Sequence, residues 1–494
     1  MIIDARSVAK DELVEADVCI IGGGPAGMTL AGELADRQLS ICLLESGGLE
    51  ADEATESLNE GESVGTPYSL VATRTRRLGG SAHQWDLEVT PDSVGARFRP
   101  LDPIDFQQRD WVPNSGWPFG RDELTTFYGR AQTLCGLGPA GYDPQHWLDG
   151  QQPLLPFGGH RIVPTIFQFG PSGRFTRLYS DKLASAENVQ IYVNGTAVRL
   201  ETDDSGRHLR RVRVATLDGA GFWATAKLFI LAAGGIENAR LLLVSDGGHR
   251  DGLGNRHGLV GRFFMEHPHL MTGFFVPSDP SVVADLPMHS VHTRNGVTIQ
   301  KKFSFGSPVF EQEGLLNYIF WLYPRSWGRQ VRYLASRRPT SPAVESLKVV
   351  RSALSARPRP KGLAEHLVNV ATGLDEIALS AATKLGWRVR EARRRAFGEG
   401  DGSEEPSLFT LIAMSEQAPN PDSRITLSGK VDRLGMRQAR LDWRLTPLDI
   451  RTLGKAQDII KQEVEDAGLG QVHVKLYGER VMPGIDIGHH HMGT

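Results

Sequence analysis

The sequence predicts an α/β fold that combines a parallel sheet and its helices with a second, antiparallel sheet. Three observations support this prediction. A short apolar run from Ala16 to Ile21 ends in glycines, a helical pattern follows from Pro25 to Arg37, and a second apolar run spans Ser40 to Leu44. Further along the chain, residues 190–235 alternate apolar and polar positions between turn signals, which indicates antiparallel strands.

The N-terminal unit is a strand, a helix and a second strand within about thirty residues, which is the length that such a unit requires. Both apolar runs are short and bounded by turn residues, as buried parallel strands are. Leu30 and Leu34 share one face of the expected helix. The unit therefore predicts two neighbouring strands of a parallel sheet and the helix that connects them.

Residues 190–235 predict the second kind of sheet. The segments IYVNGTAVRLE, RRVRVATLD and FWATAKLFILAAGG follow one another between turn signals, as in an antiparallel meander that closes with a buried strand. The last strand ends in small residues, like the first strand of the chain. We therefore expect it to return to the N-terminal sheet.

The length and charge of the chain limit the possibilities. A chain of 494 residues is too long for one ordinary core, so we expect two domains. Hydrophobic residues make up 40% of the sequence and charged residues 23%, an ordinary globular composition. Fifty-five basic and 58 acidic residues give a net charge of −3, so nothing predicts a nucleic-acid partner.

The N-terminal residues and the cysteines predict a cytoplasmic location. No basic segment followed by an apolar segment marks a secretory signal, and no apolar run is long enough to cross a bilayer, so we expect no membrane location. Cys19, Cys42 and Cys135 are too few for a disulfide framework, and a reducing compartment fits them. The first two fall in the apolar runs, as small buried hydrophobes do.

A glycine-rich turn, Gly22 to Gly27, connects the first strand to the helix in the pattern G-x-G-x-x-G. Gly22 permits a tight turn, Gly24 lets the backbone approach a diphosphate, and Gly27 lets the helix pack closely on the strand. The diphosphate then meets the helix N-terminus, where free N–H groups and the helix dipole favour negative charge. The alternative is a glycine-rich turn without a ligand.

An acidic residue strengthens the nucleotide-binding interpretation. Glu45 ends the second strand, 18 residues after Gly27, where a carboxylate can accept hydrogen bonds from ribose hydroxyls. Together, the glycines and Glu45 predict a Rossmann-like dinucleotide site. They do not distinguish FAD from NAD.

Further motifs distinguish the two cofactors by resemblance. Ser46-Gly47-Gly48, after Glu45, resembles the ESGG common in flavoproteins, and the segment from Arg77 to Ser81 resembles a glycine-rich segment of the glucose-methanol-choline (GMC) oxidoreductases. Other segments resemble the bacterial sugar-oxidising, pyranose oxidase-like branch of that family: SGWP at 115–118, GTAVRL at 195–200, LAAGGIENARLLL at 231–243, GLVGRFFMEHPH at 258–269 and EQAPNPDSRITLS at 416–428. The resemblance runs from about Ala16 to the last residue.

The resemblance implies an α/β fold, α+β overall, with a Rossmann-like FAD-binding domain interleaved with a substrate-binding domain. The second domain would be built on an antiparallel sheet with helices. The FAD-binding domain would comprise residues 1–98, 187–268 and 474–494, and the substrate-binding domain would comprise residues 99–186 and 269–473.

A basic segment at residues 325–395 lacks motif support. It holds sixteen Lys or Arg and five Asp or Glu, and its pattern predicts a mostly helical insert in the substrate-binding domain. Such a charge excess could dock an acidic electron acceptor or a membrane surface. The alternative, which we favour, is a set of solvated helical faces.

The resemblance also implies which residues lie near FAD. Gly79, Gly80 and Ser81 would contact the diphosphate and the flavin ring. Val198 would contact the adenine, and Ala233 and Gly234 would lie near the diphosphate. Some family members attach FAD covalently through a histidine that directly precedes a tryptophan. Here Gln84 precedes Trp85 and His83 is displaced by one position, so we expect FAD to be bound non-covalently.

The chain ends in His489-His490-His491-Met492-Gly493-Thr494. Consecutive histidines rarely converge on one metal, because neighbours in an extended chain point to opposite faces. The family motif H-x-x-G-T matches residues 490–494, and this resemblance gives His490 the role of general base, which takes the substrate hydroxyl proton as hydride passes to flavin N5. A histidine suits this role because its pKa lies near neutral pH. His489 and His491 are expected to be structural or to line the substrate site.

Two other histidines, His267 and His269, lie in the segment EHPH. Without a nearby cluster of carboxylates or cysteines, we expect them to serve packing. The sequence therefore predicts no metal site.

The resemblance implies an FAD-dependent enzyme, an oxidase or dehydrogenase, that oxidises an alcohol of a sugar, glycoside or aminoglycoside-like substrate to a ketone or aldehyde. Electrons would pass to oxygen or to a redox partner. Two other classes stay open. One is an NAD(P)H-dependent flavin monooxygenase or halogenase, although no second G-x-G-x-x-G motif occurs between a strand and a helix. The other is a catalytically inactive flavin-binding protein.

GMC enzymes continue beyond H-x-x-G-T with a segment that supplies a second catalytic side chain, His or Asn. By this resemblance we expect the 494 residues to be a truncated or incomplete version of a longer protein, with that second residue absent. Loss of a central strand would expose apolar sheet and unpaired backbone groups. FAD would then be weakly held or absent, and the region around His490 mobile.

Overall fold

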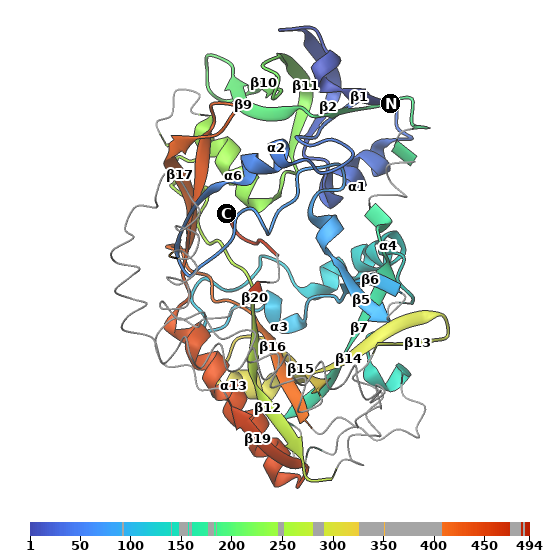
Figure 1. Ribbon diagram of the computed structural model, residues 1–494, viewed down its shortest axis with the longest axis vertical. Coiled ribbons are helices and arrows are strands. Elements are labelled where there is room, and N and C mark those ends of the chain that lie inside the picture. The colour runs from blue at the N-terminus through green and yellow to red at the C-terminus, as the bar shows by residue number, and fades with distance from the viewer. Residues whose placement is uncertain are drawn as a thin grey trace.

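The computed structural model describes residues 1–90, 93–139, 141–147, 157, 161–175, 182–183, 185–245, 251–279, 291–325, 350, 408–474, 486–487 and 490–494. Within these residues the chain forms two large sheets and one small one. Figure 1 shows one large sheet with α1 and α6 in the upper half and the other with α13 in the lower half. The C-terminus lies between the two halves.

The upper sheet has seven strands in the order β1, β8, β3, β2, β11, β10, β9. The first five are parallel to their neighbours, and the last three form an antiparallel meander. Their bounds in that order are Ile2–Asp4, Val189–Val193, Ile41–Leu44, Leu13–Ile21, Gly221–Leu231, Leu209–Ala215 and Thr196–Thr202. β11 pairs with β2, so the predicted return of the chain to the N-terminal sheet is confirmed.

The predicted meander begins later than its sequence pattern indicated. Residues 190–193 belong to β8, which lies parallel to β3. The chain then turns at Asn194, whose φ is 61°, and β9 begins at Thr196. A residue with positive φ breaks a strand. The following Gly195 lies close to Ala5, since a Cβ added to Gly195 would be 2.8 Å from the Cβ of Ala5.

Helices cover the upper sheet. α1 (Pro25–Leu34) buries Met28 and Ala31 against the parallel strands, and α6 (Gly234–Val244) buries Ile236, Ala239 and Leu241. Both helices begin directly after a parallel strand, as in a doubly wound sheet. The predicted Rossmann-like α/β architecture is therefore confirmed.

The lower sheet has ten strands, eight of them in the order β19, β12, β16, β15, β14, β7, β6, β5, with β13 beside β14 and β20 beside β12. All these pairs are antiparallel. The main strands in that order are Gly470–Val474, Pro268–Pro277, Leu408–Ser415, Tyr318–Arg325, Val297–Phe305, Ile162–Pro171, Ser93–Phe98 and Asp86–Thr90; β13 is His292–Arg294 and β20 is Asp486–Ile487.

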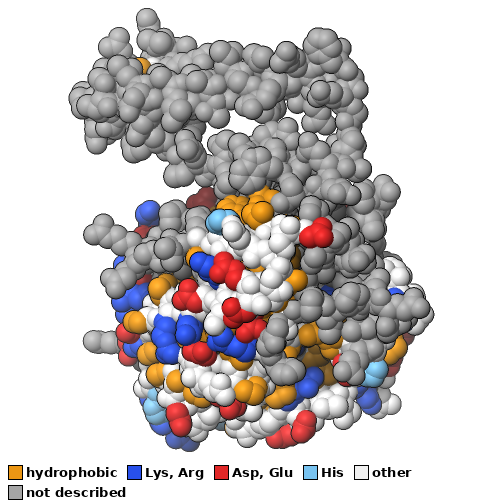
Figure 2. Space-filling model, turned by 90° about the horizontal axis from the view of Figure 1, so that it is seen from below, with side chains coloured by type: hydrophobic (Ala, Val, Ile, Leu, Met, Phe, Trp, Pro, Cys, Tyr) orange, Lys and Arg blue, Asp and Glu red, His pale blue; other side chains and the backbone are white. Residues whose placement is uncertain are grey.

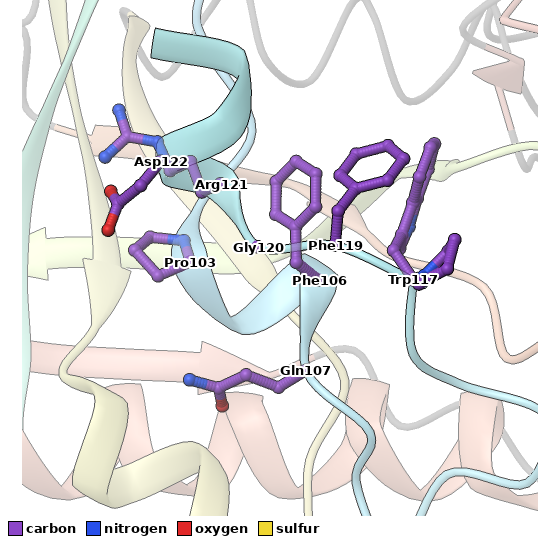
Figure 3. Close-up of a pocket in the computed structure, with 9 residues that line it drawn as sticks. Pro103, Phe106, Gln107, Trp117, Phe119, Gly120, Arg121 and Asp122 are labelled. Carbon is purple, nitrogen blue, oxygen red and sulfur yellow. The ribbon is translucent and has the colours of Figure 1, made fainter.

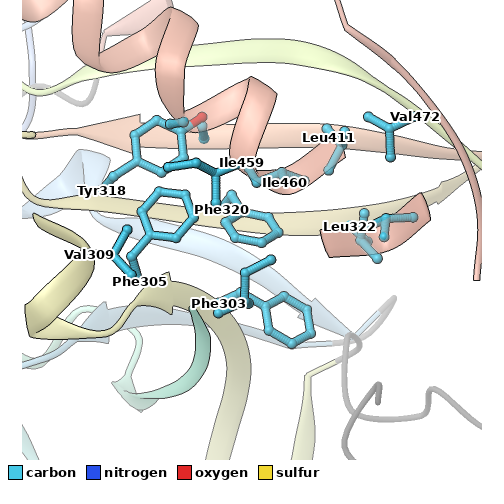
Figure 4. Close-up of a cluster of buried hydrophobic side chains, with 14 of the residues drawn as sticks. Phe303, Phe305, Val309, Tyr318, Phe320, Leu322, Leu411, Ile459, Ile460 and Val472 are labelled. Carbon is cyan, nitrogen blue, oxygen red and sulfur yellow. The ribbon is translucent and has the colours of Figure 1, made fainter. Parts of the chain in front are cut away.

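One face of this sheet packs against α13 (Pro447–Asp466) and forms the largest hydrophobic core. In Figure 4 the rings of Phe303, Phe305 and Phe320 lie on the sheet side and Ile459 and Ile460 come from the helix. Side chains alternate along a strand. The residues between these phenylalanines therefore face the opposite side of the sheet, away from α13.

A small sheet of β17 (Arg424–Val431), β18 (Arg437–Trp443) and β4 (Gly61–Gly65) lies beside α6. Buried charges hold it to α6. Arg240 bonds Asp432 at 2.6 Å, and Glu237 accepts from Arg76 at 2.9 Å and from Arg74. Because each buried charge has an opposite partner, removal of one would leave the other uncompensated.

The remaining helices are short. They are α2 (Glu53–Glu56), α3 (Pro103–Phe106), α4 (Thr125–Cys135) and α8 (Ser307–Glu313), with the 3-10 helices Ala5–Ser7, Ser57–Asn59, Gly80–Gln84, Arg121–Leu124 and Pro144–Trp147. None of the helices in the described part of the chain combines the length and the apolarity needed to cross a bilayer.

Two parts of the predicted domain division need comment. β5 and β6 fall within the predicted range 1–98, yet they pair with β7 in the lower sheet, because pairing depends on tertiary contacts rather than on sequence order. The basic insert at 325–395 lies outside the described residues, apart from residues 325 and 350. On the face in Figure 2, the described acidic and basic side chains are interspersed.

Candidate active site

Two glycine-rich segments that are far apart in the sequence meet at the end of β2. Gly79 donates its N–H to the carbonyl of Gly23 at 2.8 Å. A Cβ on Gly80 would lie 3.0 Å from the Cα of Gly24. The structure thus brings the predicted residues of the first turn and of the segment 77–81 together, and Ser81 follows in the 3-10 helix Gly80–Gln84.

The three glycines that define the G-x-G-x-x-G pattern have different surroundings. Gly22 has a φ of 112°, and a Cβ there would lie 2.5 Å from the carbonyl oxygen of Ala232. A Cβ on Gly27 would lie 1.9 Å from the carbonyl oxygen of Gly22. Around Gly24, by contrast, a Cβ would meet no atom of the chain within 4 Å. The fold itself therefore requires glycine at Gly22 and Gly27 but not at Gly24.

Glu45 lies at the end of β3, where its carboxylate accepts two backbone hydrogen bonds. Oε2 accepts from the N–H of Gly23 and Oε1 from the N–H of Gly47, each at 2.8 Å. Burial raises the pKa of Glu45 to about 7, and the two N–H groups oppose this shift. The structure shows Glu45 joining the two glycine turns, whereas the sequence predicted a contact to ribose.

The other predicted cofactor residues lie at the same end of the upper sheet. Ser46 and Thr196 share a hydrogen bond of 2.7 Å between their hydroxyls, which places the start of β9 beside the turn after Glu45. Val198 is partly buried two residues further along β9. The Ala233–Gly234 turn follows β11, and Ala232 donates its N–H to Ile21 at 2.7 Å.

The C-terminal segment closes on this region. Met492 and Met265 form an antiparallel bridge, and Thr494 donates its hydroxyl to the carbonyl of Gly235 at 3.0 Å. Gly235 belongs to the first turn of α6. The predicted catalytic segment 490–494 therefore lies beside the Ala233–Gly234 turn, between the two large sheets (Figure 1).

His490 contacts residues that precede or begin β12. Its Nδ1 lies 2.5 Å from Nε2 of His267, and the two ring centroids are 4.7 Å apart. Its backbone N–H donates to Oε2 of Glu266 at 3.0 Å. Glu266 is 2% exposed, and it also accepts from the N–H of His267 at 3.0 Å and from the hydroxyl of Tyr68 at 3.1 Å. Glu266 thus fixes the backbone on both sides of the histidine pair.

The prediction that His267 serves only packing is incomplete, because its ring contacts His490. Burial lowers the pKa of His267 to about 3, helped by His490, His269 and the basic groups Arg97 and Lys302. No signal in the sequence could have found this pair, since 223 residues separate its members. Only the pairing of β12 and the closure of the C-terminal segment bring the two rings together.

The other histidines have separate surroundings. His491 packs against the rings of Tyr68 and Phe264, each 5.8 Å away between centroids, consistent with the structural role that we expected. Nε2 of His83 lies 3.0 Å from the carbonyl oxygen of Leu78. His489 lies outside the described residues. Within the described residues, no group of three or more His, Cys, Asp or Glu side chains could hold a metal ion.

Acid should destabilise the protein through its buried histidines. Burial lowers the pKa of His269 to about 3, helped by Lys302 and Arg97. Between this value and the unfolded value near 6.5, the unfolded state binds more protons, so the free energy of unfolding falls as pH falls. Between pH 7 and pH 5, the free energy of unfolding should fall by about 2 kcal/mol less in His269→Gln than in the wild-type protein. Denaturant unfolding at the two pH values measures this difference.

Comparison with the variant is necessary because other groups act in the opposite direction. Burial raises the pKa of Glu45 to about 7 and that of Asp105 to about 6. The contribution of these two groups to the free energy of unfolding therefore decreases as pH rises. Their contributions are common to both proteins and cancel in the difference. Parallel stability curves for the two proteins would contradict the prediction.

A surface hollow of about 560 Å³ lies at α3 and the loop after it (Figure 3). The rings of Phe106, Trp117 and Phe119 line it, together with Pro103, Gln107, Pro118, Gly120, Arg121 and Asp122. It contains part of the SGWP segment but none of the predicted site residues, and it offers no histidine. The described lining of this hollow therefore contains none of the residues expected to carry the chemistry.

The fold and the convergence of the glycine turns define a dinucleotide-binding protein of the doubly wound class. Comparison with known families is more specific. Residues 17–253 match the family described as FAD dependent oxidoreductase. The match covers the region that contains the glycine turns, and the flavin prediction made from the motifs is confirmed.

Several curated proteins are similar to this chain. The 6'''-hydroxyparomomycin C oxidase of Streptomyces lividus is 28% identical over 325 residues, covering 54% of this chain and 57% of that protein. The paromamine 6'-oxidase of Streptomyces fradiae is 26% identical over 328 residues, covering 56% and 58%. The chain thus spans somewhat more than half the length of the curated relatives that it matches.

The fructose dehydrogenase large subunit of Gluconobacter japonicus is 24% identical over 331 residues, covering 54% of this chain and 61% of that protein. Among solved structures, a pyridoxine 4-oxidase from Mesorbium loti covers 94% of this chain and 84% of its own, at 15% identity and a TM-score of 0.47.

Proposed function

We propose that this protein is an FAD-dependent enzyme that oxidises an alcohol group of a sugar-like substrate to a ketone or aldehyde, with His490 as general base. The observation that carries the proposal is the closure of the C-terminal segment on the cofactor turns. Thr494, which donates to Gly235 in the first turn of α6, follows His490 by only four residues in the sequence.

The residues present fit FAD. The carboxyl ends of β2, β3 and β11 lie together, and ligands of doubly wound sheets bind at that end. At Gly24 and Gly234, a Cβ would meet no atom of the chain within 4 Å, so a cofactor can approach both backbones. The N-terminus of α1 begins at Pro25, next to Gly24, and offers N–H groups to a diphosphate. We propose that these residues, with Gly79, Gly80 and Ser81, hold FAD, and that Val198 contacts its adenine.

The histidine pair suits a base. The low pKa of His267 keeps its ring neutral, so one of its two nitrogens can accept a hydrogen bond. We propose the tautomer in which Nε2 of His267 accepts and Nδ1 of His490 donates. A histidine that carries its proton on Nδ1 presents a basic Nε2. We therefore assign Nε2 of His490 to the substrate hydroxyl and regard His267 as the residue that sets its tautomer.

The reaction then balances in a simple way. The O–H bond of the substrate breaks and its proton passes to Nε2 of His490, while the carbinol carbon loses its hydrogen with two electrons and forms a C=O bond. When bound, FAD supplies the acceptor for that hydride. Glu266 fixes the backbone of His490 and so limits the positions from which the base can act. Oxygen or a redox partner would finally take the electrons.

The proposed function is tested by anaerobic flavin bleaching across a panel of sugars, sugar acids, sugar alcohols and aminoglycosides. We expect at least one of these alcohols to bleach the oxidised flavin absorbance and NAD(P)H to leave it unchanged. Rapid bleaching by NAD(P)H, with no response to any alcohol, would instead support a monooxygenase or halogenase.

We expect FAD to be held without a covalent bond. Gln84 occupies the position that precedes Trp85, and its Nε2 donates to the hydroxyl of Thr75 at 2.8 Å. His83 must carry its proton on Nε2, because the carbonyl of Leu78 can only accept. Acid or heat denaturation should therefore release free FAD into the supernatant. Flavin absorbance that stays with the precipitated chain would contradict this prediction.

A further inference from the structure

The face of the lower sheet that points away from α13 carries basic side chains. Lys302 of β14 lies between Lys301 and Phe303, and Phe303 belongs to the core under α13. Alternation along the strand therefore places Lys302 on the opposite face. Phe167 of β7 and Trp321 of β15 lie beside it, with their ring centroids 4.8 Å and 3.3 Å from its Nζ.

Lys302 is completely buried, with 0% of its surface exposed. Its Nζ has no hydrogen-bond partner, although an ammonium group has three donors. Arg97 of β6 lies against the same two rings, 5.2 Å from Phe167 and 5.7 Å from Trp321. Within the described ranges, neither Lys302 nor Arg97 forms an ion pair with a carboxylate.

Two more buried polar atoms without a partner lie in this group, Nε2 of His269 and Nδ1 of His267. The ring of His269 is 5.2 Å from that of Trp321. One carboxylate is near: Oε1 of Glu266 is 3.9 Å from Nε2 of His267. Its oxygens already accept from backbone N–H groups and from the hydroxyl of Tyr68. Among the described residues, the carboxylate near this group is therefore one that other donors already engage.

Such an arrangement is costly unless a ligand completes it. A buried polar group without a hydrogen bond loses its hydration and gains nothing in return. Four groups that can carry positive charge, Arg97, Lys302, His267 and His269, also repel one another: the basic neighbours help to lower the pKa values of both histidines. An anion would satisfy the unpaired donors and reverse the sign of these interactions.

The group adjoins the proposed base. His267 contacts His490 at 2.5 Å, and from His269 the chain of contacts continues through Trp321 to Lys302. A substrate hydroxyl at His490 would therefore lie one contact away from this basic group.

We propose that this basic group, Arg97, Lys302, His267 and His269, binds the carboxylate of the alcohol substrate, so that the preferred substrate is a sugar acid or a similar polyhydroxy acid. The inference rests on the proposed function, because it names the substrate class of the same site. It also implies selection against amine-bearing sugars, whose positive charge would meet like charge in a buried setting.

The first test measures binding to the FAD-loaded protein by anaerobic isothermal titration calorimetry. D-gluconate and D-glucitol form a matched pair, since they differ by a carboxylate in place of one CH₂OH group, and D-glucosamine supplies the cation. We expect gluconate to bind about 10- to 100-fold more tightly than glucitol, the range for hydrogen bonds to a charged group. Equal affinity for the pair, or tighter binding of glucosamine, overturns the proposal.

Two further measurements sharpen this test. Burial lowers the pKa of Lys302, so a bound carboxylate should draw a proton onto the basic group. Titrations in buffers of different ionisation enthalpy should show proton uptake with gluconate and none with glucitol. Inorganic phosphate tests for a simple anion site. If phosphate binds as tightly as gluconate, the hydroxyls contribute nothing and the site is not a substrate site.

Lys302→Met and Lys301→Met form a matched pair of variants. The two lysines are neighbours and almost equally buried, at 0% and 2% exposed, but they face opposite sides of the sheet. Replacing the unpaired ammonium of Lys302 by an apolar side chain should raise the melting temperature and reduce gluconate affinity to that of glucitol. Lys301→Met should keep the preference for gluconate.

The outcomes separate the two proposals. A Lys302→Met protein that melts higher and still prefers gluconate overturns the inference, and so does one that melts lower with its preference intact, which would show a structural lysine. Tight gluconate binding without any flavin bleaching would support the anion site but count against alcohol oxidation. If glucitol and gluconate both bleach the flavin and bind with equal affinity, alcohol oxidation would be supported and the anion site would be contradicted.

Discussion

Replacing His490 with alanine should slow flavin reduction by the best alcohol substrate by about 10²- to 10⁴-fold, the usual loss when a general base is removed. The residue lies outside the glycine turns, and its backbone N–H, which bonds Glu266, is retained in alanine. FAD binding should therefore change little. Stopped-flow bleaching under anaerobic conditions gives the rate, and the flavin-to-protein absorbance ratio gives the occupancy.

Two other histidines serve as controls. His257→Ala alters an exposed residue and should leave the rate unchanged. His491→Ala removes a ring that packs on Tyr68 and Phe264, so it should lower stability more than it lowers the rate. An unchanged rate in His490→Ala, beside a severe loss in His491→Ala, would move the base by one residue.

Replacing Gly24 with valine should weaken FAD binding by about 100-fold or more, because a branched side chain would occupy the space of the diphosphate. The fold should tolerate this change. Gly24 has φ −76° and ψ −175°, an extended conformation that valine adopts readily, and a Cβ there meets no atom of the chain within 4 Å. FAD titration, followed by flavin fluorescence, measures the loss.

Gly27→Ala is the matched comparison. Its added Cβ would lie 1.9 Å from the carbonyl oxygen of Gly22, so the first turn of α1 must move away from the strand. We expect the melting temperature of the FAD-free protein to fall clearly for Gly27→Ala and to stay near the wild-type value for Gly24→Val. Full flavin occupancy in Gly24→Val would show that the diphosphate does not pass this glycine.

Much of the upper sheet was predictable because its signals are local. A strand, a glycine turn, a helix and a second strand follow one another within about thirty residues, and Gly27 is required by the carbonyl of Gly22 in the same turn. The acidic residue was found at its expected place, but its partners were not. Glu45 bonds Gly23 and Gly47, and this arrangement depends on how two turns fold back on each other.

The lower sheet was predictable only in kind. Its strands were expected to be antiparallel, but their order joins β12 to β16 and β14 to β7 across long stretches of sequence. Strand pairing over such distances leaves no local pattern, since any apolar strand can satisfy the edge of another. For the same reason no signal in the sequence indicated that β5 and β6 pair with β7 in the lower sheet.

The sequence by itself indicated a dinucleotide cofactor, because a glycine turn between a strand and a helix is a short, contiguous signal whose chemistry is carried by the residues themselves. Family resemblance in other short motifs added FAD and the base that we propose. The tertiary structure alone decided what surrounds that base. His269, Lys302 and Arg97 come from separate strands of one sheet, and only the register of those strands brings these basic groups together. A buried cation without a partner is visible only when its neighbours are known, because burial and pairing are properties of the fold rather than of the residue.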